Sequence, residues 1–226
     1  VSTLTSPTYD FTDTTDNDGY LRVPDLAAGQ EVYSITVSKT GYTTDQTLES
    51  SPEVPNPIRP PGTVVAQDVT TVSFSIDLVS EIELSTVDPV CQPVESVDVD
   101  VVGTKLLGTD PEVYKINDAF TTDAVGLYTL SNYEWDSYSF NVVNDYDIIG
   151  SLSPLPLSLS PGAAVPLQLL MGTSTDHSLL VYVEDSVSGD PIVDATVDID
   201  GPSYDDEGTT HSGQPPLECA PQGQVY

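Results

Sequence analysis

Residues 15–26, TDNDGYLRVPDL, and residues 32–37, VYSITV, are the part of the sequence that decides the fold. The first segment is a polar turn that ends at Gly19 and leads into a short apolar run. In the second segment apolar side chains alternate with serine and threonine. An alternation with a period of two residues places one set of side chains in a core and the other in solvent. The stretch therefore predicts two short β-strands joined through a Gly-containing loop.

The same pattern occurs further along the chain. A second copy covers residues 122–130 and 138–142, and a third begins at residue 210 and continues to the last residues. Glycine, proline, asparagine and aspartate separate the short alternating runs, and no stretch shows a sustained helical period. Repetition indicates that similar modules follow one another. We predict an all-β fold of tandem antiparallel β-sandwich domains of the immunoglobulin-like kind.

We predict three modules, at residues 1–78, 79–172 and 173–226. Alternating apolar residues predict a half-buried strand over residues 69–78, whereas residues 104–120 are predicted to be irregular. The first module lacks its opening strands. The third lacks its closing strand, which we expect a neighbouring chain to be able to supply.

The charge of the chain limits its partners. Thirty-six acidic residues and five basic ones among 226 residues give a formal net charge of −31. Such a surface repels nucleic acid and anionic lipid, so we predict no nucleic-acid partner. The sequence has no apolar run long enough to cross a bilayer, so we predict no membrane contact by this segment. Solubility and cation binding are the properties that this charge favours.

Several short elements point to a known kind of domain. They are a Gly-x-Pro turn at residues 189–191, the sequence SKTGY at residues 38–42 and a Thr-x-x-x-Gly turn at residues 122–126. These elements resemble the carboxypeptidase regulatory-like domain, a transthyretin-like sandwich, although residues 144–146 depart from its Lys-x-Gly-Tyr element. Residues 108–115 look like segments of pilin-like microbial surface proteins. The resemblance implies an extracellular location, in tandem arrays on a cell surface or as accessory modules of secreted enzymes.

The two ends of the chain suggest an interface between chains. Each end lacks roughly the strands that the other contains, so an open sheet edge at one end could pair with the other end of a second chain. The residues that we predict at this edge are Ser34, Ile35, Thr36, Val37, Val225 and Tyr226. Two interpretations stay open: the chain is a window of a longer array, or it associates head to tail into a filament.

The sequence contains no arrangement of residues that predicts catalysis. His177 and His211 are its two histidines, and neither belongs to a paired-histidine metal motif or accompanies a nucleophile elbow. The many carboxylate pairs, such as Asp98 with Asp100, have a spacing that puts both side chains on one outward strand face. We therefore predict that the protein is not an enzyme.

Calcium is the one cofactor that the acidic residues suggest. Asp13, Asp16 and Asp18 precede Gly19 in an order that resembles part of a calcium loop. Thr14 stands where the first ligand belongs, and no glutamate follows at the required distance. The alternative interpretation is a plain turn, because asparagine and aspartate favour turns by themselves.

Two further groups leave alternatives open. Cys91 and Cys219 are too far apart in sequence for a compact metal motif, and they could pair with each other, pair with another chain, or stay reduced. Tyr133, Trp135 and Tyr138 could form a platform on which a sugar stacks, or they could fill the core of a small sandwich.

These observations predict a structural subunit of an extracellular microbial surface filament, pilus-like fibre or adhesive stalk. Its expected partners are further copies of itself and a host-surface or glycan ligand. The alternative is a carbohydrate- or calcium-binding accessory array of a secreted enzyme.

Overall fold

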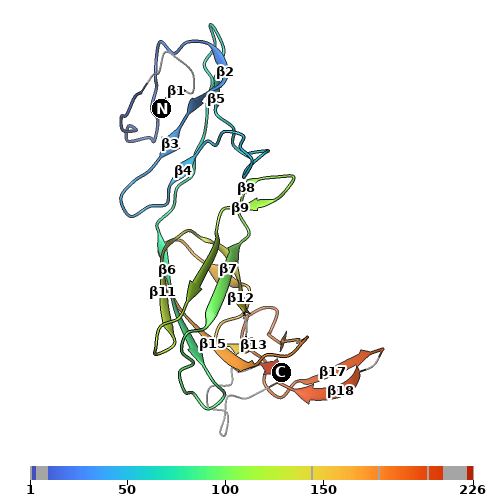
Figure 1. Ribbon diagram of the computed structural model, residues 1–226. Coiled ribbons are helices and arrows are strands. Elements are labelled where there is room, and N and C mark those ends of the chain that lie inside the picture. Colours follow the sequence, from blue (N-terminus) through green and yellow to red (C-terminus); the bar gives the residue numbers. More distant parts are fainter. Residues whose placement is uncertain are drawn as a thin grey trace. The chain divides into compact units, whose positions relative to one another are not determined.

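The computed structural model describes residues 2–3, 10–143, 145–177, 179–202, 204–210 and 223–225. Over these residues the chain forms strands and turns and no helix, which confirms the predicted all-β fold (Figure 1). Contacts divide the chain into two units: Val1–Leu78 with Lys105–Lys115, which we call the N-terminal unit, and Val79–Thr104 with Ile116–Tyr226, the C-terminal unit. The division into three modules at residues 78 and 172 stays a prediction.

Two four-stranded sheets form a sandwich in the C-terminal unit. Their strand orders are β10-β7-β12-β14 and β11-β6-β15-β13, and every neighbouring pair is antiparallel except β15 with β6. The strands are β6 (Ser80–Val87), β7 (Asp98–Gly103), β10 (Asn117–Thr121), β11 (Leu127–Tyr133), β12 (Asp136–Val143), β13 (Tyr146–Ser151), β14 (Leu157–Leu159) and β15 (Ala164–Thr173).

The first and last strands of the sandwich, β6 and β15, lie side by side and run parallel. Their pairing extends from Ala164 opposite Glu81 to Leu170 opposite Val87. A parallel pair needs a long crossover connection, and here all the intervening strands of both sheets provide it. The strand that opens the module is therefore hydrogen-bonded to the strand that closes it.

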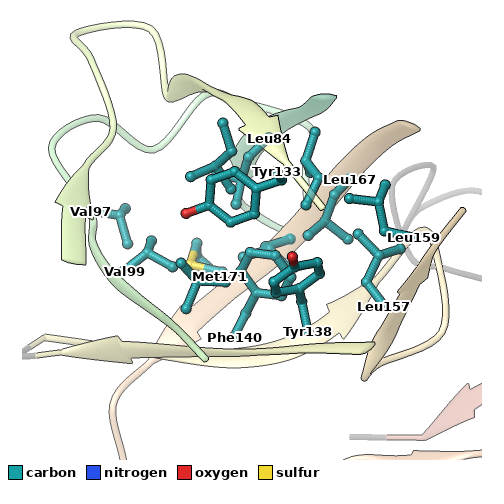
Figure 2. Close-up of a cluster of buried hydrophobic side chains, with 14 residues drawn as sticks. Leu84, Val97, Val99, Tyr133, Tyr138, Phe140, Leu157, Leu159, Leu167 and Met171 are labelled. Atoms are coloured by element: carbon teal, nitrogen blue, oxygen red, sulfur yellow. The ribbon is translucent and has the colours of Figure 1, made fainter. Parts of the chain in front are cut away.

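Alternating side chains fill the space between the two sheets. In β6, Ile82 and Leu84 are buried and Glu83 between them is exposed, as a period of two predicts. Figure 2 shows Tyr133 and Tyr138 inside a cluster of leucine, valine and phenylalanine side chains. Burying one large apolar side chain contributes about 1.5–3 kcal/mol. This cluster is therefore the main source of stability that the C-terminal unit contains.

A smaller set of strands follows the sandwich within the C-terminal unit. It consists of two hydrogen-bonded pairs, β16 with β19 and β17 with β18. The strands are β16 (Val181–Tyr182), β17 (Thr196–Gly201), β18 (Tyr204–Thr209) and β19 (Gln224–Val225). The β17–β18 pair is the orange and red hairpin of Figure 1.

One buried side chain connects this set to the sandwich. The backbone N–H of Ser151, at the end of β13, donates to Oε1 of Gln224 at 2.9 Å, and Nε2 of Gln224 donates to the carbonyl of Ser151 at 2.6 Å. Both residues are buried, and an unpaired buried amide costs about 1–3 kcal/mol. The double contact therefore holds β19 at the end of β13.

The N-terminal unit contains short strands. A three-stranded sheet has the order β1-β2-β5, and two further pairs are β3 with β4 and β8 with β9. The strands are β1 (Ser2–Thr3), β2 (Gly29–Ser34), β3 (Thr36–Val37), β4 (Asp45–Gln46), β5 (Gly62–Val64), β8 (Leu106–Gly108) and β9 (Val113–Tyr114).

The prediction that residues 104–120 are irregular is wrong. These residues form the β8–β9 hairpin of the N-terminal unit and then β10 of the sandwich. The hairpin is held by hydrogen bonds from the N–H of Ile58 to the carbonyl of Leu107 and from the N–H of Thr109 to the carbonyl of Asn56, both 2.9 Å. Backbone hydrogen bonds with Asn56 and Ile58, about 50 positions earlier in the chain, give the segment its structure. The local sequence pattern does not show which distant segment will pair with it.

The strand predicted over residues 69–78 is not formed. Residues 69–77 have no strand assignment, and only Leu78 makes an antiparallel bridge, to Tyr42. Val69 is 78% exposed and Val72 is 40% exposed. The apolar alternation is present, but among the described residues backbone-to-backbone pairing reaches only the end of the segment, where the carbonyl of Asp77 accepts a hydrogen bond from the N–H of Thr43 at 2.8 Å.

Candidate assembly site at the terminal repeats

The hydrogen bonds around Gly126 define the framework of the sandwich module. The N–H of Thr86 donates to the carbonyl of Gly126 at 2.8 Å, and the N–H of Val94 donates to the carbonyl of Thr86 at 2.9 Å. Gly126 has a φ of +72°, and a Cβ there would lie 2.6 Å from the carbonyl oxygen of Thr86. The close approach of these backbones therefore requires glycine.

The set of strands that follows the sandwich repeats this framework. The N–H of Val183 donates to the carbonyl of Gly223 at 2.8 Å, and the N–H of Ile192 donates to the carbonyl of Val183 at 2.9 Å. Gly223 has a φ of +74°, and a Cβ there would lie 2.8 Å from the carbonyl oxygen of Val183. Val183, Ile192 and Gly223 thus correspond to Thr86, Val94 and Gly126 of the sandwich.

A buried threonine makes the same pair of contacts in both places. The N–H of Thr122 donates to the carbonyl of Val97, and the N–H of Val97 donates to Oγ1 of Thr122, both at 2.9 Å. Thr210 and Ala195 exchange the same two hydrogen bonds, also at 2.9 Å. In both places Oγ1 of the threonine accepts a hydrogen bond from a backbone N–H and so takes the place of a backbone carbonyl. This contact explains why a threonine begins each repeated turn.

Strand register completes the correspondence. In the sandwich Val99 of β7 lies opposite Phe120 of β10, and in the following set Val197 of β17 lies opposite Gly208 of β18. We call the strands β16 to β19 the third repeat. Its described residues contain counterparts of β6, β7, β10 and the start of β11, but no counterpart of β12, β13, β14 or β15.

The third repeat therefore exposes positions that are core in the sandwich. Ile82 is 0% exposed, whereas its counterpart Leu179 is 66% exposed. Val181 and Val197, the counterparts of the buried Leu84 and Val99, are only partly buried. In the described part of the chain β16 has no neighbour in the place where β6 has β15. We call this apolar side of β16 and β17 the open face.

The N-terminal unit contains the later strands of the same module. Asp16 and Asp123 begin identical turns: the N–H of Asp16 donates to the carbonyl of Tyr20 and the N–H of Asp123 to that of Leu127, both at 2.9 Å. Gly19 and Gly126 both have positive φ in these turns. Asp25 and Asn132, six residues after each glycine, also share a positive φ, of 60° and 65°.

A buried tyrosine marks the next strand in both units. The hydroxyl of Tyr33 donates to the carbonyl of Ala27 at 2.7 Å, and the hydroxyl of Tyr138 donates to the carbonyl of Glu134 at 2.8 Å. Tyr33 lies opposite Gly62 of β5, as Tyr138 lies opposite Leu157 of β14. Strand β2 is therefore the counterpart of β12, and β5 is the counterpart of β14.

The same comparison explains why residues 69–78 form no strand. The bridge from Tyr42 to Leu78 corresponds to the pairing of Tyr146 with Thr173, which aligns residues 69–78 with all of β15. Val72, Phe74 and Ile76 then take the places of three buried residues of β15, which are Leu167, Leu169 and Met171. The described residues of the N-terminal unit include no counterpart of β6, the strand with which β15 pairs.

The predicted edge residues are only partly where the prediction put them. Ser34 belongs to β2, which lies between β1 and β5, so the prediction of an edge is wrong there. Thr36 and Val37 pair with β4 on one side, and Ile35 lies between β2 and β3. Val225 pairs with Val181. Tyr226 lies outside the described residues.

The three carboxylates predicted to bind calcium do not converge. Oδ1 of Asp16 accepts hydrogen bonds from the N–H groups of Asp18 at 3.0 Å and Tyr20 at 2.9 Å, and Oδ1 of Asp13 accepts one from the N–H of Thr14 at 2.8 Å. The described part of the chain brings together no group of three or more metal-binding side chains. Turn formation accounts for the positions of these aspartates.

Of the two cysteines and two histidines, the structure describes Cys91 and His177. Cys91 is disulfide-bonded. Cys219 lies outside the described residues, so its pairing with Cys91 stays a prediction. His177 is exposed, and His211 also lies outside the described residues.

The aromatic platform considered for sugar binding is not formed. Tyr133 and Tyr138 are buried, with ring centroids 5.3 Å apart, and both point into the core (Figure 2). Trp135, between them in sequence, is 46% exposed. Tyr133 ends β11, Tyr138 lies in β12 and Trp135 lies in the bend between these strands, so the two tyrosines fill the sandwich as the alternative interpretation proposed.

Tyr133 and Tyr138 are expected to stay protonated well above pH 10. Burial raises the pKa of both phenols above the ordinary value. The hydroxyl of Tyr133 also donates a hydrogen bond to the carboxylate of Asp118 at 2.8 Å, and this carboxylate raises the pKa of Tyr133 further. A folded pKa above the unfolded value of about 10 contributes stability that is present below pH 10 and is lost as the pH rises through the folded pKa.

Tyrosinate absorbance tests this expectation. The chain has 12 tyrosines, and in the native protein only some of them should ionise by about pH 11. In denaturant all of them should ionise over the same range. Removing both buried phenols, in Tyr133→Phe with Tyr138→Phe, should leave the native titration up to that pH unchanged. If the native double variant showed less tyrosinate absorbance than the natural chain over this pH range, the assignment of Tyr133 and Tyr138 as protonated residues would be contradicted.

Comparison with known proteins adds a weak structural likeness. No protein-family model and no curated protein matches the sequence. Among solved structures, the chain is similar to a mutant of the shaft pilin SpaA from Lactobacillus rhamnosus GG, with 13% identity and a TM-score of 0.27. The match covers 49% of this chain and about half, 54%, of the pilin chain. A similarity of this size does not assign a family or a function. Within the described residues there is no helix long and apolar enough to cross a membrane.

Proposed function

We propose that this protein is a non-catalytic structural subunit of an extracellular filament or stalk on a microbial surface. The observation that carries the proposal is the recurrence of one module along the chain. The same turn, the same buried tyrosine contact and the same threonine contact appear in successive repeats at matching distances. A string of like modules is suited to spanning distance, because each module adds length without adding a new site.

The connection of strands within the sandwich suits a load-bearing role. Strand β6 opens the module, β15 closes it, and the two are hydrogen-bonded in parallel. Tension on the two ends pulls these strands along their length in opposite directions. All hydrogen bonds between them then resist the force together, instead of breaking one after another from an end.

The charge of the chain is compatible with an exposed filament. A net charge of −31 keeps neighbouring filaments apart and makes association between subunits depend on salt. Glycan or calcium binding stays the alternative function and has less support among the described residues, because Tyr133 and Tyr138 are buried and the carboxylate of Asp16 accepts hydrogen bonds from N–H groups of its own turn.

Association measured against ionic strength tests the proposed function. Raising the salt from about 10 mM to about 0.15 M shortens the screening length from about 30 Å to about 8 Å, so repulsion between chains falls. We expect light scattering to show concentration-dependent assembly at the higher salt, and negative-stain micrographs to show beaded rods. A chain that remains monomeric at millimolar concentration in both salts would contradict the proposal.

A further inference from the structure

We propose that a cleft between β10 and β11 of one molecule binds the side chain of Arg22 of a second molecule. This inference rests on the proposed function and names one contact through which the subunits join. Strand β10 is at the edge of one sheet of the sandwich, and β11 is at the edge of the other. The cavity between them has a volume of about 340 Å³, and we call it the lateral cleft.

Strand register places the lateral cleft between the inner faces of the two sheets. Asp118 of β10 lies opposite the fully buried Val101, and Tyr128 of β11 lies opposite the buried Leu84. Residues that are directly opposite in an antiparallel pair share one face of the sheet. Asp118 and Tyr128 therefore belong to the inner faces, and yet both are exposed. In the described part of the chain no further strand pairs with β10 or β11 on this side.

The lateral cleft combines an aromatic surface with a carboxylate. The rings of Phe120 and Tyr128 are stacked, with centroids 4.2 Å apart and planes at 20°. The buried Tyr133 donates its hydroxyl to Oδ2 of Asp118 at 2.8 Å, whereas Oδ1 of Asp118 accepts no hydrogen bond from the described residues. A guanidinium group pairs with carboxylates and stacks on aromatic planes, so an arginine side chain suits this arrangement.

The distribution of basic residues shows where such a side chain is available. The C-terminal unit contains neither lysine nor arginine, so it cannot neutralise the carboxylate of the lateral cleft itself. A second copy of the chain brings cations on its N-terminal unit, and opposite charges on the two units favour an oriented contact between copies. The five basic residues, all in the N-terminal unit, are Arg22, Lys39, Arg59, Lys105 and Lys115.

Arg22 is the member of this set that is available for a contact with another molecule. Arg59 carries an ion pair, Lys39 lies over an aromatic ring, and the two lysines that flank the β8–β9 hairpin have partners. Arg22 is exposed, and within the described residues its side chain makes no ion pair and no hydrogen bond. Its neighbours Tyr20 and Leu21 are 73% and 39% exposed, and they supply apolar area that the contact would bury.

The contact is compatible with assembly at moderate salt. A net charge of −31 repels a second copy over long distances, and the screening length at about 0.15 M salt is about 8 Å. The two groups of an ion pair lie within about 4 Å of each other, well inside that length. Added salt therefore weakens the long-range repulsion more than it weakens the contact.

Reversal of each charge tests the pairing of the two residues. Arg22→Glu and Asp118→Lys should each raise the protein concentration needed for assembly by about tenfold or more, as measured by light scattering. A chain that carries both changes again has opposite charges at every contact, and it should assemble within about threefold of the natural concentration. A double variant that assembles no better than the single variants would overturn the pairing.

Control variants make the same changes of net charge outside the contact. Asp100→Lys lies on the outer face of the same sheet, opposite Ala119, and Lys39→Glu is exposed on the N-terminal unit. Each should change the assembly concentration by less than about threefold. Asp118→Asn removes the charge but keeps an oxygen for the hydroxyl of Tyr133, and it should still impair assembly. Circular dichroism checks that every variant keeps its strands.

Cross-linking detects the contact whether or not long filaments form. In full-length Arg22→Lys, a carbodiimide condenses the new amine with a carboxylate that it touches, with loss of water. A mixture of natural-abundance and ¹⁵N-labelled chains shows by mass spectrometry whether the joined peptides come from different molecules. We expect a cross-link between positions 22 and 118 of different molecules, and its disappearance when Asp118→Asn is added.

The outcomes separate this inference from the proposed function. If the natural chain forms filaments while Arg22→Glu and Asp118→Lys form them equally well, the contact is wrong and the filament role stands. If the natural chain never assembles, the filament role fails and the cross-link decides on the contact. A cross-link between positions 22 and 118 then supports the contact, and its absence overturns it.

Discussion

Replacement of Gly126 by alanine is expected to lower the free energy of unfolding of the C-terminal unit by about 3 kcal/mol. The left-handed backbone, with a φ of +72°, disfavours any residue with a Cβ. The new Cβ would also lie 2.6 Å from the carbonyl oxygen of Thr86 and 2.8 Å from that of Val94. Both neighbours are backbone atoms of the framework, so relief requires movement of β6 or of the adjoining turn.

Gly19→Ala is the matched control for this substitution. Gly19 occupies the same turn with the same hydrogen bonds and a φ of +83°, but no atom lies within 4 Å of its added Cβ. Only the backbone strain remains, and we expect a loss of about 1 kcal/mol. Urea unfolding followed by far-ultraviolet circular dichroism measures both variants. Equal losses would show that crowding at Gly126 has no effect.

Leu167→Ala is expected to destabilise the C-terminal unit by about 3–4 kcal/mol. Leu167 is fully buried at the centre of β15, opposite Leu84, and belongs to the cluster that holds the two sheets together (Figure 2). Truncation removes apolar contacts with both sheets and leaves a cavity that surrounding strands fill only in part. The parallel pairing of β6 with β15 weakens because its central side-chain pair is lost.

Leu152→Ala is the control for the core substitution. Leu152 follows β13 and is 61% exposed, so the same change of side chain should cost less than about 1 kcal/mol. Fluorescence of Trp135, the single tryptophan, follows the unfolding of the C-terminal unit. If both leucines gave the same midpoint in urea, Leu167 would not be a core residue in solution.

The strands of the sandwich could be predicted from local pattern. The alternation at Ile82 and Leu84 and at Val99 and Val101 belongs to strands of the structure, with the apolar residues inside. The turns could also be predicted from the sequence, because an aspartate followed by a glycine three residues later favours one backbone conformation. These features depend on neighbouring residues, so the sequence shows them directly.

The errors have a different origin. Residues 69–78 have the pattern of a strand, but among the described residues backbone pairing reaches only their end, where the carbonyl of Asp77 accepts a hydrogen bond from the N–H of Thr43 and Leu78 forms a bridge with Tyr42. Residues 104–120 lack a clear pattern, yet backbone pairing with Asn56 and Ile58 makes their first part a hairpin. The candidate edge at Ser34 failed because β1, far away in sequence, pairs there.

The sequence by itself determined the class of structure, the alternation of each module strand and the glycines at its turns, because a Cβ or a polar side chain acts on its immediate surroundings. Only the tertiary structure decided that β15 pairs with β6 in parallel, that Tyr133 and Tyr138 face inward, and that the third repeat has an open face. Those properties depend on hydrogen bonds and contacts between segments about 80 residues apart, as from Ala164 to Glu81, and no local pattern records which distant strand a backbone will meet.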